Sequence, residues 1–343
     1  MNNKQDNLLP GKIPGELLNN LLNKINITDP RVVVGAEIGE DAALLDLGDK
    51  YMTITTDPIT FATDLLGWYL VNINANDIAV TGAKPKWLTT TLLFPTHTKP
   101  KEISKIFDDI LAACKKIDVT VIGGHTEITD SISKPIAIGT MLGEVKKEET
   151  VLTSGAKPGD TIILTKGIGI EGTSILCRDL KTILIDNGVP DTTIKAGKDY
   201  LFEPGISIIK DVYTILNTAK VNSMHDLTEG GLSTGIIEMA TASKVGVVIN
   251  SADLIISPIT LDCCRATSIN PLGLLSSGAL IATLNPSNVN NVIAALSKEN
   301  ILCKKIGYVT EKESGILLNF PKETIEFPRF NRDELARCFD MFN

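Results

Sequence analysis

The stretch WYLVNINANDIAVTGAKP at residues 68–85 has the apolar spacing of a helix, yet four polar residues stand in its middle: Asn72, Asn74, Asn76 and Asp77. Asparagine and aspartate are poor residues for a helix interior because their side chains compete for backbone hydrogen bonds. Asn74 and Asp77 are three residues apart and therefore share one helix face. That face is either a solvated surface or part of a site. Solvated faces usually carry Glu and Lys, so we predict that this helix contributes polar groups to a site.

The chain of 343 residues is long enough for two domains. Strand-like and helical stretches follow one another without strict βαβ order, which favours an α+β fold. A polar segment at 146–159, which ends in Pro158-Gly159, predicts a boundary. We expect an N-terminal extension at 1–34, a first domain at 35–147, a second domain at 158–320 and a tail at 321–343.

Hydrophobic periodicity predicts the elements of each half. In the first half we expect a hairpin of strands 42–47 and 51–56, further strands at 87–94, 119–122 and 135–145, and helices at 65–81 and 100–117. In the second half we expect a strand that starts at DTIILTKG, strands near 220–224, 246–250, 278–284, 303–310 and 315–319, and helices near 171–182, 203–218, 231–243, 260–268 and 286–299.

The overall composition is that of a soluble globular protein, with 43% hydrophobic and 22% charged residues. A net charge of -8, without any basic cluster that carries aromatic residues, argues against a nucleic-acid partner. An acidic protein can still bind an anion, either through local cations and backbone N–H groups or through divalent cations held by its carboxylates.

The six cysteines form no CxxC pair, which indicates a reducing compartment and no zinc site. The N-terminal sequence MNNKQDNLLPGK lacks the apolar core of a signal peptide, and no apolar run reaches the ~18 residues of a membrane span. We therefore expect a cytoplasmic protein that has no membrane partner.

Acidic residues recur at the predicted strand ends, at Asp41, Asp57, Glu127 and Asp226. Any one of them alone is more typical of a turn or a helix N-cap. Several together provide the hard oxygen ligands that Mg²⁺ takes, along with substrate phosphates. Glycine pairs accompany two of these acids, at Gly123-Gly124 and Gly230-Gly231, and their backbone N–H groups can receive phosphate.

Other nucleotide and catalytic signatures are absent from the sequence. There is no Walker A motif, no kinase signature set, no GxSxG and no legible Ser/His/Asp arrangement. GIGIEG at 167–172 has the spacing GxGxxG, but no acid follows at the distance that a dinucleotide fold requires.

His125 and His225 each stand beside a motif that combines glycine and an acid. Each is either a general base or phosphate partner, or an imidazole that is hydrogen-bonded for structural reasons. A zinc site is disfavoured, because no cysteine or second histidine lies near His125 at ligand spacing.

Six motifs in order along the chain, from about residue 35 to 311, resemble the PurM-like ATP-binding superfamily: GEDAALLD (39–46), TTDPIT (55–60), NANDIAVTGAKP (74–85), GGHTE (123–127), GIEGTSIL (169–176) and HDLTEGGL (225–232). This superfamily includes aminoimidazole ribonucleotide (AIR) synthetase, thiamine-monophosphate kinase, selenophosphate synthetase and the hydrogenase maturation protein HypE. NDIAVTGAKP and the EGT sequence are most similar to the AIR synthase-related, HypE-like group.

The resemblance implies two α+β domains and a homodimer in which the N-terminal sheets pair into a barrel. It also implies ATP in a cleft of the N-terminal domain, with Mg²⁺ between the phosphates and acids. Carried over motif by motif, the metal ligands are Asp41, Asp57, Asp77, Glu127 and Asp226. The implied nucleotide or phosphate contacts are Lys12, Thr56, Asn76, Gly123, Gly124 and Thr126. The catalytic candidates are His125, His225 and Asp226.

The chain departs from its relatives at three places. His125 stands where many relatives have Asp, so the carboxylate function passes to Glu127. PGKIPG (10–15) replaces a glycine-rich loop, with Lys12 as a substitute phosphate contact. The sequence ends in ELARCFDMFN, whereas HypE-type proteins end in Pro-Arg-Ile-Cys with a cysteine that carries a carbamoyl group; we expect Cys338 to be a packing residue.

These observations predict an ATP- and Mg²⁺-dependent enzyme that phosphorylates or activates an amide-type or small-molecule oxygen on an acceptor that the sequence does not identify. The alternatives are a small-molecule kinase that resembles thiamine-monophosphate kinase and a non-catalytic nucleotide-binding protein that acts in a maturation assembly.

Overall fold

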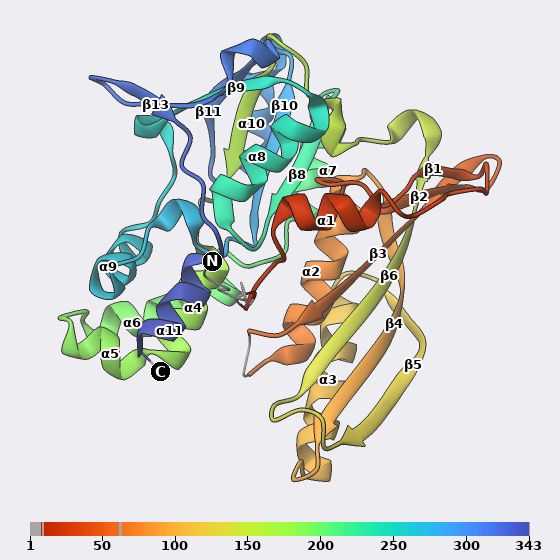
Figure 1. Ribbon diagram of the computed structural model, residues 1–343, viewed down its shortest axis with the longest axis vertical. Coiled ribbons are helices and arrows are strands. Elements are labelled where there is room, and N and C mark those ends of the chain that lie inside the picture. Colours follow the sequence, from red (N-terminus) through yellow and green to blue (C-terminus); the bar gives the residue numbers. More distant parts are fainter. Residues whose placement is uncertain (1–7, 9, 62–63, 343) are drawn as a thin grey trace, which may run out of the picture.

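The computed structural model describes residues 8, 10–61 and 64–342, so residues 1–7 of the expected N-terminal extension lie outside it. The described chain forms two sheets that are joined by a short connection, each with its own helices (Figure 1). The α+β prediction is confirmed. None of the described helices is both long and apolar enough to span a bilayer.

The N-terminal sheet has the strand order β1-β2-β3-β6-β4-β5. The strands are β1 (Val32–Val34), β2 (Ala43–Asp46), β3 (Lys50–Ile59), β4 (Lys84–Pro95), β5 (Thr120–Thr129) and β6 (Ile136–Lys146). Neighbouring strands are antiparallel except β4 and β5. Helices α2 (Leu66–Val80) and α3 (Pro100–Lys116) lie on one side of this sheet (Figure 1).

Burial along β6 alternates strictly, since every second residue from Ala137 to Val145 is buried and those between are half-buried. This period of two means that one face packs on α2 while the other is open in a single chain. α2 itself is buried almost all round, so it is a core helix.

Strand β5 differs from the prediction, because it continues through GGHTE to Thr129 instead of ending at 122. The register between β5 and β4 shifts by one residue opposite Leu88 and Thr89. This β-bulge lets β5 continue through the two glycines. At Gly124, with φ +153°, a Cβ atom would lie 2.1 Å from the Thr90 carbonyl oxygen, so only glycine fits there. The sequence suggested a turn because glycine usually interrupts strands.

The C-terminal sheet has the order β13-β12-β9-β11-β7-β10-β8. Its strands are β7 (Thr161–Thr165), β8 (Ser223–Leu227), β9 (Gly246–Asn250), β10 (Ala279–Leu284), β11 (Cys303–Thr310), β12 (Ile316–Asn319) and β13 (Thr324–Glu326). β7 is antiparallel to both of its neighbours, so GIGIEG does not open a parallel dinucleotide unit.

Helices cover both faces of the C-terminal sheet. Ile162 and Leu164 of β7 pack with α8 (Gly231–Ser243), whereas Ile163 packs with α7 (Ile209–Thr218) and α10 (Val289–Lys298). The apolar cluster around Ile163 also includes Ala79 and Val80 at the end of α2. The two halves of the chain therefore share buried apolar contacts.

The remaining helices form a lobe beside α2 (Figure 1). They are α4 (Ile170–Asp179), α5 (Lys181–Asp186), α6 (Asp191–Lys198), α9 (Pro258–Thr267) and α11 (Glu334–Phe342). The expected tail contributes α11, whose Leu335 and Cys338 are fully buried in the same core cluster as α2. The predictions missed α1 (Gly15–Leu22), β1, α6 and β13. The single helix expected near 171–182 is two helices, α4 and α5, and the helix expected near 203–218 begins only at Ile209.

Candidate functional site

Acidic residues from both halves of the chain meet where the two sheets adjoin. Asp41 precedes β2, Asp57 lies in β3, Asp77 in α2, and Asp226 near the end of β8. Asp41, His225 and Asp226 form a group whose potential ligand atoms all lie within 4.8 Å of one another. We call Asp41, Asp57, Asp77 and Asp226 the acid site. The pattern of acids at predicted strand ends indicated Asp41, Asp57 and Asp226, and the polar residues of the predicted helix indicated Asp77; the structure brings these four together.

Asp57 and Asp77 form the N-terminal part of the acid site. The Thr55 hydroxyl donates a hydrogen bond to Asp77 Oδ2 at 2.7 Å, and the Asp57 backbone N–H donates to Asn74 Oδ1 at 3.1 Å. Burial raises the pKa of Asp57. Burial, followed by the charge on Asp57, raises the pKa of Asp77 well above its usual range. Two adjacent carboxylates, of which Asp77 is buried and Asp57 half-buried, are expensive to ionise without a counter-charge.

Asp226 supplies the C-terminal part. It is 2% exposed, and its Oδ2 atom has no hydrogen-bond partner among the described residues. Burial, with the charge of Asp41 as the next cause, raises the pKa of Asp226 to about 8. An unpartnered buried carboxylate oxygen that faces other carboxylates is a position suited to a cation.

His225 is held between two carboxylates. Its Nδ1 lies 2.9 Å from Asp41 Oδ2 and its Nε2 lies 3.2 Å from Glu238 Oε2. Burial opposes protonation, but Asp41 and Glu238 together raise the pKa of His225 well above the usual value. Both ring nitrogens are therefore engaged, and the charged imidazolium joins Asp41 of the first half to Glu238 of the second. This arrangement fits a structural cation better than a free general base.

The buried position of the asparagines excludes the solvated-face interpretation of α2. Asn72, Asn74 and Asn76 are at most 2% exposed. Asn72 and Asn74 donate to the carbonyl oxygens of Trp68 and Leu70, one turn earlier.

Asn76 connects α2 to the other half of the chain. Its Nδ2 donates to the Ile206 carbonyl oxygen at 2.8 Å, and its Oδ1 accepts from the Ile208 N–H at 3.0 Å. Both functional atoms of the amide are thus occupied by backbone, so in this conformation Asn76 holds the two halves together.

Lys12 reaches the acid site from the N-terminal segment. Its backbone N–H donates to Glu229 Oε1 at 2.7 Å, and its ammonium lies 3.5 Å from Glu238. Desolvation lowers the pKa of Lys12, but the charges of Glu238 and Glu229 outweigh this effect and raise the pKa above its usual value. Neither glutamate was among the residues predicted from the sequence. Glu229 belongs to the HDLTEGGL motif and could have been found there, whereas Glu238 lies on α8 without a motif.

A segment between the halves also contacts the acid site, and no sequence signal indicated it. The Thr153 hydroxyl donates to Asp41 Oδ2 at 3.1 Å, and the backbone N–H groups of Thr153 and Ser154 donate to the Glu40 carboxylate. These bonds hold the loop that presents Asp41.

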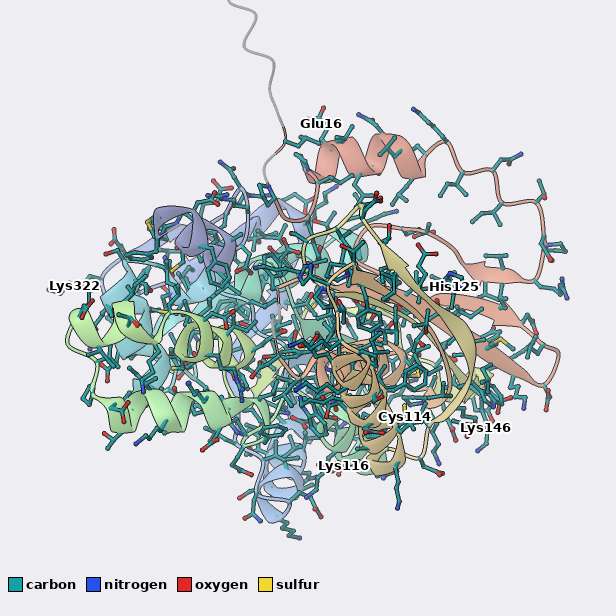
Figure 2. The ribbon with its side chains drawn as sticks, turned by 90° about the horizontal axis from the view of Figure 1, so that it is seen from below. Glu16, Cys114, Lys116, His125, Lys146 and Lys322 are labelled. Carbon is teal, nitrogen blue, oxygen red and sulfur yellow. The ribbon has the colours of Figure 1, made fainter. Side chains whose placement is uncertain are left out.

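The GGHTE residues lie elsewhere in a single chain, on the exposed edge strand β5. His125 Nε2 lies 2.9 Å from Glu127 Oε2, and their side chains are 64% and 48% exposed. Figure 2 shows His125 on this strand at the outside of the molecule. Glu127 is not in the group formed by Asp41, His225 and Asp226. Gly123, Gly124 and Thr126 are exposed on the same strand. Thr56 lies on β3, where its hydroxyl donates to the Gly139 carbonyl oxygen at 2.8 Å.

The second glycine pair lies at the start of α8, and a carboxylate of this chain already occupies it. The Gly230 N–H donates to Asp333 Oδ2 at 2.6 Å. Burial raises the pKa of Asp333 to about 7. The Gly231 N–H donates to the Thr228 carbonyl oxygen. The glycines were predicted to receive phosphate; in this conformation the carboxyl group of Asp333, from the segment before α11, occupies the helix start.

Comparison with known proteins matches nearly the whole described chain. Residues 39–145 match the model of the AIR synthase related protein N-terminal domain, and residues 157–318 match that of the C-terminal domain. The putative hydrogenase expression/formation protein MJ0676 of Methanocaldococcus jannaschii is 28% identical over 321 residues, which are 90% of this chain and 91% of that protein. Carbamoyl dehydratase HypE of Rhizobium leguminosarum bv. viciae is 24% identical over 293 residues, 83% of this chain and 79% of the relative.

The fold is also found in a solved structure of hydrogenase maturation protein HypE in complex with ATP. The TM-score is 0.72 at 19% identity, and the match covers 90% of this chain and 92% of the other. The two matched domain models, which lie in order on either side of the connecting segment, show that this chain belongs to the AIR synthase related protein family.

Proposed function

We propose that the protein is an ATP- and Mg²⁺-dependent enzyme of the AIR synthase-related, HypE-like group, which phosphorylates or activates an amide-type or small-molecule oxygen. The observation that carries the proposal is the acid site, where carboxylates from both halves converge around the unpartnered Asp226 Oδ2. The relatives named above as a HypE carbamoyl dehydratase and as a HypE that binds ATP support this choice.

The donor set fits Mg²⁺. It consists of hard carboxylate oxygens, and burial together with mutual repulsion makes their ionised forms costly without a cation. The residues that would hold the ion are Asp41, Asp57, Asp77 and Asp226, and the ion would supply neutralising charge for the nucleotide phosphates. The acid site thereby accounts for nucleotide binding by a chain of net charge -8.

The remaining side chains orient this site. Protonated His225 holds Asp41 against the C-terminal half, and Asn76 anchors α2 to residues 206–208. Lys12 is a half-exposed cation within reach of the same space. Because phosphoryl transfer needs mainly positioning and charge neutralisation, such a frame is sufficient machinery.

Cys338 does not offer an accessible thiol for a carried group. Its side chain is fully buried, and burial raises the pKa of the thiol to about 11. We therefore place the acceptor oxygen on a separate small molecule or protein, in agreement with the expected packing role of this cysteine.

Isothermal titration with ATP, with and without Mg²⁺, tests the proposal. We expect saturable binding that requires the metal, followed by release of ADP when the correct acceptor is supplied. A phosphate ester among the products would identify a small-molecule kinase, whereas free phosphate with loss of an amide oxygen would identify an activating synthase or dehydratase. Folded protein that binds no nucleotide at millimolar concentration would contradict the proposal, and binding without any turnover would favour a non-catalytic role.

We also propose that the protein acts as a homodimer whose N-terminal sheets pair into a barrel. Strand β5 is exposed along most of its length, including Ile122 at 56% and Ile128 at 50%. A ten-residue edge strand with exposed apolar side chains invites pairing with another chain. The second copy would also cover the open face beside β6.

Light scattering coupled to gel filtration tests the dimer. We expect twice the chain mass of 36.9 kDa for the natural protein. Ile122→Lys with Ile128→Lys should shift the protein to monomer, because two buried charges oppose association. Ile185→Lys is the matched control, since Ile185 is 44% exposed on α5, away from β5. A monomeric natural protein would overturn this proposal.

A further inference from the structure

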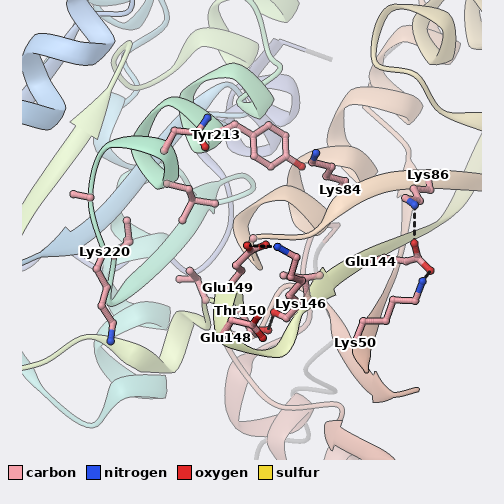
Figure 3. A pocket seen from close by; sticks show the side chains of 17 residues that line it. Lys50, Lys84, Lys86, Glu144, Lys146, Glu148, Glu149, Thr150, Tyr213 and Lys220 are labelled. Atoms are coloured by element: carbon pink, nitrogen blue, oxygen red, sulfur yellow. Dashed lines mark hydrogen bonds and ion pairs between the residues drawn. The ribbon is translucent and has the colours of Figure 1, made fainter. Parts of the chain in front are cut away.

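A cavity of about 700 Å³ lies between the two halves and is lined by none of the acid-site residues (Figure 3). Its walls are the ends of β3, β4 and β6, the connecting residues 148–151, and α7 with the residues that follow it. Five lysines line it: Lys50, Lys84, Lys86, Lys146 and Lys220. We call it the lysine pocket.

Some of these lysines are neutralised and others are not. Glu144 accepts ion pairs from both Lys50 and Lys86, at 2.5 and 2.6 Å, and Lys146 pairs with Glu149 at 2.8 Å. No carboxylate among the described residues pairs with Lys84 or Lys220. Figure 3 shows these two lysines on different sides of the pocket. Glu148 also lines the pocket without an ion-pair partner in the described part of the chain, so five lysines face three glutamates, and the remaining net positive charge attracts an anion even on an acidic protein.

The base of the pocket is apolar and well supported. Val145, Val151 and Val221 are at most 7% exposed. Tyr213 forms a fixed wall, because its hydroxyl donates to the Ala83 carbonyl oxygen at 2.6 Å. A cavity of this size, lined by apolar side chains and a few polar groups, has the dimensions of a small-molecule site.

We propose that the lysine pocket binds a small organic anion that carries phosphate or carboxylate groups. Lys84 and Lys220 bind the anionic groups, and the valines contact the apolar part of the ligand. The proposal concerns a different place from the acid site, and it does not depend on the proposed function.

Both walls of the pocket continue directly into the acid site. Residues 148–151 lead to Thr153, which donates to Asp41, and Val221 precedes the strand that carries His225 and Asp226. The Ser223 hydroxyl donates to the Thr153 carbonyl oxygen at 2.7 Å and joins the two walls. A ligand in the lysine pocket therefore contacts both segments that place the acid-site carboxylates, which gives it a physical route to regulate that site.

Titration calorimetry with pyrophosphate and with citrate, each in EDTA and without nucleotide, tests the proposal. We expect saturable binding of at least one of them, and the comparison separates a preference for phosphate from one for carboxylate. Lys84→Gln with Lys220→Gln should weaken that binding about tenfold or more, because both unpaired cations are lost. The matched control, Lys304→Gln with Lys305→Gln, removes two exposed lysines of β11 and should leave the affinity unchanged.

Two further measurements locate the binding. Asp226→Asn, which alters the acid site, should bind the probe as the natural protein does. Acetylation footprinting by mass spectrometry should show protection of Lys84 and Lys220 by the probe, and no protection of Lys304 and Lys305. Absence of binding with both probes, unchanged affinity of the double variant with both variants folded, or protection of all four lysines alike would overturn the proposal.

Discussion

Asp226→Asn is expected to lower the Mg²⁺-dependent affinity for ATP by more than about 100-fold while leaving the metal-free protein as stable as before or more stable. Loss of a residue that merely supports a metal ligand typically costs 10–100-fold in metal affinity, so loss of a ligand costs more. Stability is spared because Oδ2 of Asp226 has no partner to lose among the described residues. Calorimetry with Mg-ATP and urea unfolding with EDTA measure the two effects.

The pH dependence gives this prediction a second readout. The pKa of Asp226 is raised to about 8 in the folded chain, so the native state holds a proton that the unfolded state releases above about pH 4. The contribution of Asp226 to the free energy of unfolding therefore falls as the pH rises from 4 to 8, by at most about 1.4 kcal/mol per pH unit. Asp226→Asn should flatten that slope, and Mg²⁺ should flatten it in the natural protein.

Two comparisons complete the test. Asp77→Asn should also strongly weaken metal-dependent binding with little loss of stability, because the amide oxygen of Asn can still accept the Thr55 hydrogen bond. Asp186→Asn, at an exposed residue of α5, should change neither property. If Asp226→Asn lowered stability and nucleotide affinity to the same extent, the acid site would be structural.

His225→Ala is expected to destabilise the folded protein by about 3–5 kcal/mol, because it leaves Asp41 and Glu238 without the buried cation between them. The decrease in the free energy of unfolding should be largest at low pH. The pKa of His225 is raised in the folded chain, so its stabilising contribution is fully present below about pH 6.5 and is lost as the pH rises through the folded value. Urea unfolding at a series of pH values measures this.

His125→Ala is the matched control within the same chain. His125 is 64% exposed and contacts Glu127 on a single strand, so its removal should change the free energy of unfolding by no more than about 0.5 kcal/mol. Equal losses for both histidines would contradict the view that His225 joins the two halves. Unchanged turnover in His125→Ala would assign that histidine a surface role, and a large loss of turnover would restore it as a catalytic candidate.

Local pattern was sufficient for most of the fold. The helix predicted at 65–81 is α2 (Leu66–Val80), and the hairpin of β2 and β3, the long strand β6 and helix α8 lie close to their predicted positions. Strand β6 alternates with a period of 2, whereas α2 and α8 are largely apolar runs that are too long for a strand, so in each case the signal lies in residues a few positions apart. The six motifs also indicated the family, because they can be recognised in the sequence, in their order, without any knowledge of the structure.

The errors have local causes as well. β5 continues past 122 because a bulge beside β4 accommodates Gly123 and Gly124, and no propensity rule extends a strand through two glycines. Helices α1 and α6 have only eight residues each, and residues of low helix propensity, such as Asn19 and Asn20 in α1 and Thr192 and Gly197 in α6, weaken their local signal.

Sequence alone therefore determined the residue types of the acid site and the elements that carry them, since carboxylates at strand ends and asparagines inside a helix are visible in the chain. The tertiary structure decided which of these groups meet. His225 and Asp41 are 184 positions apart, yet they form one ion pair, while His125 and Glu127 remain on an exposed edge. The tertiary structure also brings Glu238 and Lys12 to the site, and it brings the Asp333 carboxyl group to the Gly230 N–H, which donates a hydrogen bond to it. The reason is physical: contacts between distant segments depend on how whole faces pack, and that information lies in no short window of the sequence.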